Sequence, residues 1–273
     1  MTQSYRQRDA DRFETTGDGV EILFPEIFRS MPGLIAGVTT RRGGVSPEPF
    51  GMNISAKVGD DPAAVDANRR RAFAAFGVSE RAIAHPGQVH SDRIERVSGA
   101  GRVADCDALM TTVPGLFLAV TIADCVPILL HDPVSGLCAA VHSGWRGSAE
   151  NILGKSIAAI LRAGLSRAEH LRAYIGPSAG VCCYEVGEEV AARFDRRFVV
   201  GSGNGRLHVD LKIFNRSVLL SCGIPEDQID CSRHCTICEG EHFHSYRRER
   251  ERSGRMMALI GRRAEAVDER RDP

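Results

Sequence analysis

The sequence predicts an α+β fold in which short buried strands form the core and amphipathic helices cover it. Strands are predicted by apolar runs such as LFLAVTI, VPILL and LCAAV, which are too short for buried helices. Helices are predicted by segments such as SAENILGKSIAAILRAG, whose apolar residues recur about every 3.6 positions. A chain of 273 residues can bury a sizeable core in one large domain or two small ones.

The chain begins with a polar segment that we expect to be flexible over residues 1–20. This segment has mixed charge and lacks the apolar core of a secretory signal, so we expect it to be retained and the protein to be cytoplasmic. Early strands are expected at EILFPEIF and LIAGVTT, which are residues 21–28 and 34–40. A helix is expected over residues 61–76, because Asp61 suits the N-cap and Pro62 suits the first turn.

Between those strands and that helix lies a long loop, TRRGGVSPEPFGMNISAKVGDD. A loop of this length is uncommon in a compact domain unless it covers a site, so we expect it to face the substrate; the alternative is a disordered excursion. Arg41 and Arg42, beside Gly43 and Gly44, are candidates for binding an anion through their guanidinium groups and exposed backbone amides. Arginine beside glycine is also common on ordinary turns, so this pattern alone does not decide the matter.

The chemistry is expected in the stretch ADCVPILLHDPVSGLCAAVHSGWRG, residues 123–147. Its two apolar runs are expected to be strands joined by the turn DPVSG. Antiparallel pairing could bring Cys125, at the start of one strand, close to His142, at the end of the next. A thiolate and an imidazole together suggest a metal site. His90, in the segment QVHS, is a third candidate ligand because those two are present, whereas a lone histidine is usually an ordinary core or surface residue.

The elements expected in the rest of the chain include two longer helices, a short helix at EEVAARF, a strand at LRAYI and a last strand. The two longer helices cover about residues 148–164 and 208–223, and each ends at a glycine. The segment RMMALI is expected to form the last strand, and the charged tail 263–273 is expected to be disordered. Cys182 and Cys183 are interpreted as small buried residues, because adjacent cysteines do not easily chelate one ion.

A CxxC motif, Cys235 and Cys238, is the second candidate for metal binding. Other possible ligands lie nearby in the sequence: Cys231, His242 and His244. A structural zinc site usually pairs two such motifs and this chain has one, so unliganded loop thiols are the preferred interpretation. The residues that follow the motif, Tyr246, Arg247 and Arg248, form either a solvated edge or part of an anion pocket.

Composition limits the classes of partner. Lys+Arg and Asp+Glu each number 35, and this balance argues against nucleic acid or an anionic membrane as the main ligand and favours small molecules. The longest apolar stretch, residues 113–130, is interrupted by Asp124 and two prolines, which fits buried sheet rather than a membrane span. Nine cysteines in a chain without an export signal are expected to be free thiols or metal ligands rather than disulfides.

Several motifs occur together in a set order: TRRGGVS, QVHS, DALMTTVPG, ADCVPILL, VHSGWRG, IGPSAG with YEVG, HVDL, HCT, and SYRRE with GR. In this set and order, from Thr39 to Gly261, the chain resembles the laccase-domain family. Its members are called multicopper polyphenol oxidoreductases, peptidoglycan editing factors, or purine nucleoside phosphorylases of the adenosine-cleaving type.

The resemblance implies a single catalytic domain over residues 21–262, folded as a layered αββα sandwich of mixed sheets with flanking helices. It makes His90, Cys125 and His142 zinc ligands with a fourth position open, as in a catalytic zinc site, although copper is also possible. By motif, it assigns substrate or phosphate binding to Arg41, Asn53, Arg146, Tyr246 and Arg247. The chain departs from the family at Ser143 and His244, and His244 could add an imidazole near the pocket.

The activity that the resemblance implies is zinc-dependent phosphorolysis of adenosine, inosine, guanosine and methylthioadenosine, together with deamination of adenosine. Asp124 or Asp107 is a candidate for proton transfer, and the alternative for Asp124 is to orient a histidine ring. Arg41 and Arg146 suit a phosphate clamp. The oligomeric state is not fixed by the sequence, and a monomer is plausible.

Two other functions compete with this one. A copper-dependent polyphenol oxidase would need repeated His-x-His pairs to build a copper cluster, and the chain has one such pair, His242 and His244. A cell-wall precursor editing factor would act on, or bind, muramyl peptides. Loss of Cys125 would separate catalysis from binding.

Overall fold

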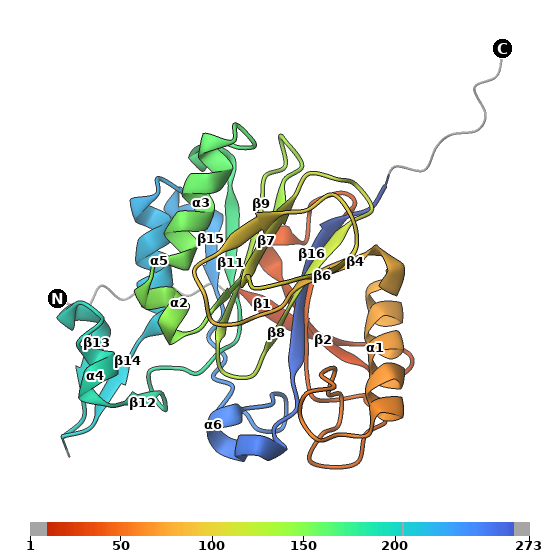
Figure 1. The fold of residues 1–273 in the computed structure, drawn as a ribbon, viewed down its shortest axis with the longest axis horizontal. Coiled ribbons are helices and arrows are strands. Elements are labelled where there is room, and N and C mark those ends of the chain that lie inside the picture. Colours follow the sequence, from red (N-terminus) through yellow and green to blue (C-terminus); the bar gives the residue numbers. More distant parts are fainter. Residues whose placement is uncertain (1–9, 204, 265–273) are drawn as a thin grey trace.

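The computed structural model describes residues 10–203 and 205–264, which form one domain around two large facing sheets (Figure 1). The first sheet has seven strands and is mixed, because β4 runs parallel to both of its neighbours while the other pairs are antiparallel. In spatial order its strands are β1 (Asp11–Thr15), β2 (Glu21–Pro25), β3 (Leu34–Thr39), β16 (Met256–Arg262), β8 (Phe117–Ile122), β4 (Ile83–Pro86) and β6 (Gly101–Val103).

The second sheet has six strands, and its centre is the antiparallel pair β9 and β10. In spatial order its strands are β15 (Ile229–Cys231), β11 (Arg172–Ile175), β9 (Val126–His131), β10 (Cys138–Ser143), β7 (Ala108–Thr111) and β5 (Ile94–Arg96). A small three-stranded sheet lies beside it, formed by β12 (Glu185–Val186), β14 (Leu207–Val209) and β13 (Val199–Gly201).

Helices cover the outer faces of the two large sheets. Figure 1 shows α1 on one side of the sheets and α2, α3 and α5 on the other. The α-helices are α1 (Pro62–Phe76), α2 (Trp145–Ala149), α3 (Ile152–Arg162), α4 (Glu188–Ala191), α5 (Leu211–Ser221) and α6 (Tyr246–Glu249). Short 3₁₀ turns lie at Glu26–Phe28, Glu80–Ala82, Ala168–His170, Arg196–Phe198, Glu226–Gln228 and Arg250–Arg252.

Three apolar clusters show why the layers form. Along β9, Leu129 faces the first sheet whereas Ile128 and Leu130 face the helices, which is the two-residue period of a strand buried on both sides. The middle cluster joins the two sheets, and the outer clusters join each sheet to its helices, with Phe73 and Phe76 of α1 packed on the first sheet. The predicted α+β class with layered sheets and flanking helices is therefore confirmed.

Local signals account for several element boundaries. Asp61 accepts hydrogen bonds from the backbone amides of Ala63 and Ala64, so α1 begins where the N-cap was predicted. The predicted helix over residues 148–164 is instead two helices. Asn151 adopts a left-handed φ of 59° and caps α3 through Gly154, so the chain turns between α2 and α3.

The predicted flexible segment 1–20 is wrong over residues 11–15, which form strand β1. Tyr174 donates a 2.6 Å hydrogen bond to Asp11, and the ring of Phe13 stacks on that of His242 at 4.3 Å, so tertiary contacts hold this polar strand in place. Residues 1–9 and most of the predicted disordered tail, residues 265–273, lie outside the described residues. Within the described ranges, no helix has the length and apolar character needed to cross a bilayer.

Candidate metal centre and substrate pocket

The pairing of β9 with β10 brings two of the predicted metal ligands together. His142 pairs with Pro127 and Ser143 with Val126, so Cys125 lies just before β9 at the same end of the sheet. His90 arrives from the turn after β4, and its Nε2 is 3.9 Å from the Sγ of Cys125. The ligand atoms of His90, Cys125 and His142 all lie within 4.8 Å of one another.

The turn that carries His90 is held by side chains on both sides. Gln88 and His90 have positive φ values of 40° and 60°, an unfavourable backbone conformation for these residue types. The side-chain amide of Gln88 donates a hydrogen bond to the carbonyl oxygen of Thr121 and accepts one from the backbone N–H of Thr121. These are the two bonds that a neighbouring strand would make with this residue. The carboxylate of Asp107 accepts from the backbone amides of Val89, His90 and Ser91.

Asp107 also fixes the orientation of His142. Its Oδ1 is 2.8 Å from Nδ1 of His142, which leaves the other ring nitrogen for a metal. Burial raises the pKa of Asp107, but the hydrogen bond from His142 and those from Ser91 bring it down to about 2. Asp107 is fully buried and is not among the pocket-lining residues, and its carboxylate contacts His142 directly.

Electrostatics favour the thiolate that a metal needs. Burial raises the pKa of Cys125, but the adjacent His142 brings it down to about 6. Burial lowers the pKa of His142, whereas Cys125 and Asp107 raise it to about 9. The thiolate is the form that ligates metals, so the lowered pKa of Cys125 favours binding, whereas His142 would have to release its proton when a metal binds.

The donor set and the space around it fit zinc. One cysteine and two histidines are common zinc ligands, and three protein ligands leave a fourth position for water or substrate. Gly144 keeps the site open, because a Cβ at this position would lie 3.0 Å from the Sγ of Cys125 and 3.1 Å from Cδ2 of His90. The residues present therefore fit a catalytic zinc ion.

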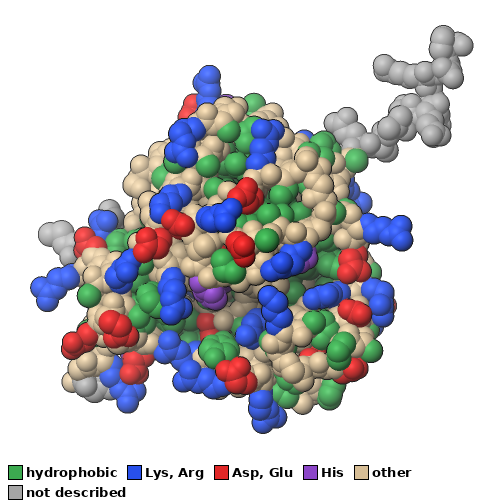
Figure 2. Space-filling view, in the orientation of Figure 1, with side chains coloured by type: hydrophobic (Ala, Val, Ile, Leu, Met, Phe, Trp, Pro, Cys, Tyr) green, Lys and Arg blue, Asp and Glu red, His purple; other side chains and the backbone are tan. Residues whose placement is uncertain are grey.

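The three candidate ligands open onto a cavity of about 1150 Å³, which is large enough for a nucleoside and phosphate. Figure 2 shows histidine atoms in the hollowed centre of this face with Lys and Arg side chains around them. The C-terminal part of the long loop, including Ile54 and Lys57, lines the cavity, in agreement with the predicted substrate-facing loop. Aromatic walls come from Trp145, Tyr184 and Tyr246.

Arg146, Arg247 and Arg255 supply positive charge to the cavity. Each guanidinium lies over an aromatic ring, at 4.5 Å from Trp145, 5.2 Å from Tyr184 and 5.6 Å from Tyr246 respectively. None of the three pairs with a carboxylate of the described residues. They are therefore available to an anion. The segment SYRR, which the sequence placed either on a solvated edge or in an anion pocket, thus contributes Tyr246 and Arg247 to the pocket wall.

Asp124 lines the cavity, but its carboxylate is already engaged. Its Oδ1 accepts from the hydroxyl of Thr236 at 2.7 Å, and its Oδ2 accepts from the backbone N–H of Arg247 at 2.6 Å. Asp124 has a φ of 91°, so these bonds also hold a strained backbone. The histidine-orienting role considered for Asp124 belongs instead to Asp107.

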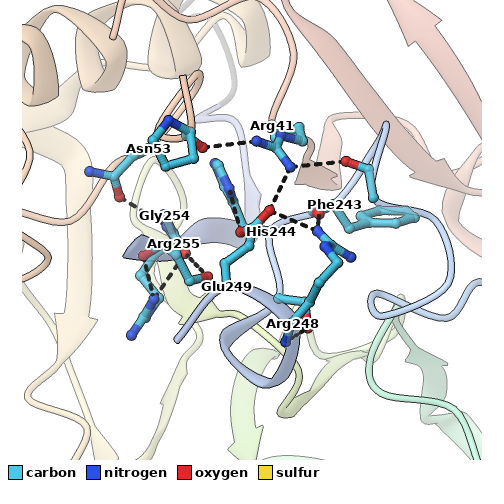
Figure 3. Close-up of polar contacts among 12 residues, drawn as sticks. Arg41, Asn53, Phe243, His244, Arg248, Glu249, Gly254 and Arg255 are labelled. Atoms are coloured by element: carbon cyan, nitrogen blue, oxygen red, sulfur yellow. Dashed lines mark hydrogen bonds and ion pairs between the residues drawn. The ribbon is translucent and has the colours of Figure 1, made fainter. Parts of the chain in front are cut away.

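Arg41 is placed outside this cavity. Its guanidinium donates to the carboxylates of Glu249 and Glu48, both at 2.7 Å, and to the carbonyl oxygens of Gly240 and Pro49 (Figure 3). It borders a separate shallow hollow of about 520 Å³. These contacts give Arg41 a structural role and do not support it as a phosphate clamp.

Asn53 and His244 also lie away from the cavity. Asn53 is fully buried, and its Oδ1 accepts from the backbone N–H of Arg255 at 2.9 Å, so it positions a pocket residue without lining the pocket. His244 is fully buried against Gly254, whose Cβ position would be 2.5 Å from the ring, and adds no imidazole to the pocket. Ser143 bonds to Ser148 and Asn215 in the core.

Tyr184 and Arg255 are among the pocket residues that were not assigned from the sequence. The sequence motifs that contain them were noted, because Tyr184 belongs to YEVG and Arg255 belongs to the GR that follows SYRRE. The prediction that Cys182 and Cys183 are buried is wrong. Cys182 is exposed and Cys183 is half-buried, because both lie on a tight turn at the surface, where the amide of Cys183 donates to the carbonyl of Gly180.

Residues 35–263 match the sequence profile of the family described as multi-copper polyphenol oxidoreductase laccase. The chain belongs to this family. The laccase-family relatives include the protein named purine nucleoside phosphorylase YlmD of Geobacillus stearothermophilus, which is 36% identical over 253 residues, covering 85% of this chain and 92% of that protein. Another, from an unknown prokaryotic organism, is named adenosine deaminase RL5 and is 32% identical over 262 residues, covering 89% of this chain and 100% of that protein.

A solved structure shows the same laccase-family fold. The crystal structure of YlmD from Geobacillus stearothermophilus has a TM-score of 0.86 to this chain at 34% sequence identity. The match covers 93% of this chain and 100% of that one.

Proposed function

We propose that this laccase-family chain is a zinc-dependent purine nucleoside enzyme of the cytoplasm. It would cleave adenosine, inosine, guanosine and methylthioadenosine with phosphate, and would deaminate adenosine. The observation that carries the proposal is the cluster of His90, Cys125 and His142 in the wall of a cavity that is also lined by Arg146, Arg247 and Arg255, none of which pairs with a carboxylate of the described residues. Relatives named for phosphorolysis and for deamination support both activities.

Phosphorolysis requires phosphate to attack C1′ of the ribose while the bond to the purine breaks and the purine takes up a proton. Arg146, Arg247 and Arg255 would hold the phosphate by charge-assisted hydrogen bonds and stabilise charge in the transition state. Tyr184 and Tyr246 offer aromatic surfaces for the purine ring. Asp124, a carboxylate that lines the cavity, is proposed to transfer the proton in deamination of adenosine, and Asp124→Asn tests this role by its effect on deamination.

Deamination requires an oxygen nucleophile at C6 of the purine and a proton for the departing ammonia. Zinc, when bound, supplies Lewis-acid activation of the nucleophile. The chain's own contribution is to hold the three ligands, through Asp107 and the turn at His90, and to orient the base against the aromatic wall.

Copper-oxidase chemistry is less well supported by the geometry. The single His-x-His pair, His242 and His244, joins neither group of possible metal ligands in the described part of the chain. His242 instead lies 2.8 Å from Glu21, and His244 is buried. A histidine-rich copper cluster therefore has no counterpart among these residues.

The test is to incubate metal-analysed protein with adenosine, with and without phosphate, and to separate inosine, adenine and ribose 1-phosphate by chromatography. We expect adenine and ribose 1-phosphate only when phosphate is present, inosine in either case, and neither from Cys125→Ala. Absence of all products from the zinc-loaded wild type would contradict the proposal and favour a binding role toward cell-wall precursors.

A further inference from the structure

A second cluster of thiols lies outside the cavity and is not used by the proposed reaction. Cys182 and Cys183 come from the turn after β11, and Cys235 and Cys238 come from the loop after β15. Their four sulfurs all lie within 4.8 Å of one another. The Sγ of Cys238 is 3.2 Å from that of Cys183 and 3.5 Å from that of Cys182.

The spacing of these sulfurs fits a shared metal ion better than disulfides. All four cysteines are free thiols, and a disulfide would need an S–S distance of about 2.05 Å. Around a tetrahedral zinc with Zn–S bonds of about 2.3 Å, neighbouring sulfurs lie about 3.8 Å apart. The separations of 3.2 and 3.5 Å are somewhat shorter than that value, and all four sulfurs lie within 4.8 Å of one another, so side-chain adjustments of a few tenths of an ångström would complete the tetrahedron.

The backbone around the cluster donates hydrogen bonds to the sulfurs and approaches them closely. Gly180 donates its N–H to the Sγ of Cys235 at 3.2 Å, and a Cβ on Gly180 would lie 3.2 Å from the Sγ of Cys182. Backbone amides of Ile237 and Cys238 are also directed at the sulfur of Cys235. Amides that point at a sulfur stabilise its thiolate form.

We propose that Cys182, Cys183, Cys235 and Cys238 form a second metal site that binds zinc through four thiolates. Four thiolates in a tetrahedral arrangement are the ligand set of structural zinc, and no coordination position remains for substrate. Zinc binding would release the remaining thiol protons to solvent. The inference does not rest on the proposed enzymatic activity.

Such a site would brace the wall of the cavity. Cys183 directly precedes Tyr184, and Cys235 directly precedes Thr236, whose hydroxyl donates to Asp124. The site would therefore tie together two segments that are 56 positions apart in sequence, between Cys182 and Cys238, at the point where they meet the pocket.

The experiment measures zinc per chain in the full-length protein purified from zinc-supplemented culture without metal-affinity resin. We expect two zinc ions in the wild type, one in Cys125→Ala, and one in the double variant Cys183→Ser/Cys238→Ser. Cobalt loaded into Cys125→Ala should give the strong visible and charge-transfer absorption of a tetrahedral tetrathiolate site. This second measurement keeps the test valid if the double variant does not fold.

Cys222→Ser is the matched control, because Cys222 is a half-buried free thiol on another element and should leave two zinc ions bound. A wild-type protein with one zinc, lost in Cys125→Ala, would overturn the proposal. So would cobalt binding without thiolate absorption, iron in place of zinc, or fewer than the nine thiols expected after denaturation and metal removal.

Discussion

Asp107 and His142 form a buried pair in which Oδ1 of the carboxylate lies 2.8 Å from Nδ1 of the imidazole. The same carboxylate accepts hydrogen bonds from three backbone amides of the turn that carries His90. One buried side chain therefore positions two of the three proposed zinc ligands. It connects β7, at whose N-terminal end it lies, to both the β10 ligand and the turn after β4.

Asp107→Asn should weaken zinc binding about 10- to 100-fold, because an outer carboxylate both orients the ligating ring and raises its basicity. Competition with a chromophoric chelator measures the change in zinc affinity. Asp92→Asn is the control, since Asp92 is ion-paired with Lys155 near the surface. An unchanged affinity in Asp107→Asn would remove Asp107 from the account of the site.

Gly144→Ala should reduce zinc content and activity together. The added methyl would lie 3.0 Å from the Sγ of Cys125 and 3.1 Å from Cδ2 of His90, so the ligands would have to move apart. Zinc per chain and turnover are measured on the same preparation. Gly99→Ala, where no atom lies within 4 Å of the new methyl, should retain both. Full zinc occupancy in Gly144→Ala would show that this close approach is not needed.

Arg146→Ala should raise the KM for phosphate about 10- to 100-fold, since a hydrogen bond to a charged group contributes about 1.5–3 kcal/mol. Arg41→Ala should leave that KM nearly unchanged and instead lower the free energy of unfolding by about 1–3 kcal/mol, because Glu249 loses one of its two arginine partners. Steady-state kinetics with varied phosphate and urea unfolding separate the two effects. A raised phosphate KM in Arg41→Ala alone would return the clamp role to that residue.

Glu249 should make stability depend on pH. Burial raises its pKa, but the ring of His244, 3.8 Å away, the hydrogen bond from Arg248 and the charge of Arg41 bring it from 4.5 to about 2. A carboxyl with a lowered folded-state pKa stabilises the fold above pH 4.5, by about 3 kcal/mol, and loses this as the pH falls toward 2. Urea unfolding at several pH values should show a smaller acid-side loss in Glu249→Gln. Equal losses in both proteins would contradict the prediction.

The pairing of Cys125 with His142 could be predicted from the residues because it depends on a local pattern, whereas the layered sandwich and His90 as a third zinc ligand were implied by the family resemblance. The runs around Cys125 and His142 read as two strands joined by a short turn, and that pairing alone brings the two residues together. The start of α1 at Asp61 could be predicted in the same way, because the N-cap signal is local. The split at Asn151 was missed, since an asparagine in the left-handed conformation interrupts an otherwise periodic apolar stretch.

The remaining site assignments depended on partners that are distant in sequence. Nothing near Arg41 indicates that Glu249, 208 positions away, holds its guanidinium, so an arginine in a Gly-rich loop looked like a phosphate clamp. The adjacent Cys182 and Cys183 looked unable to share an ion until the fold placed the CxxC motif beside them. Residue type was informative in each case, but only the tertiary structure shows which groups face one another.

The central claim is that purine nucleoside chemistry depends on zinc held by His90, Cys125 and His142. The most direct measurement removes metal from the wild-type protein with a chelator, restores zinc stepwise, and follows adenosine conversion together with zinc bound per chain. The account predicts that activity is lost on removal and returns as this site fills, and that Cys125→Ala gains no activity at any zinc level. Full activity in the metal-free protein, or activity in Cys125→Ala, would contradict it.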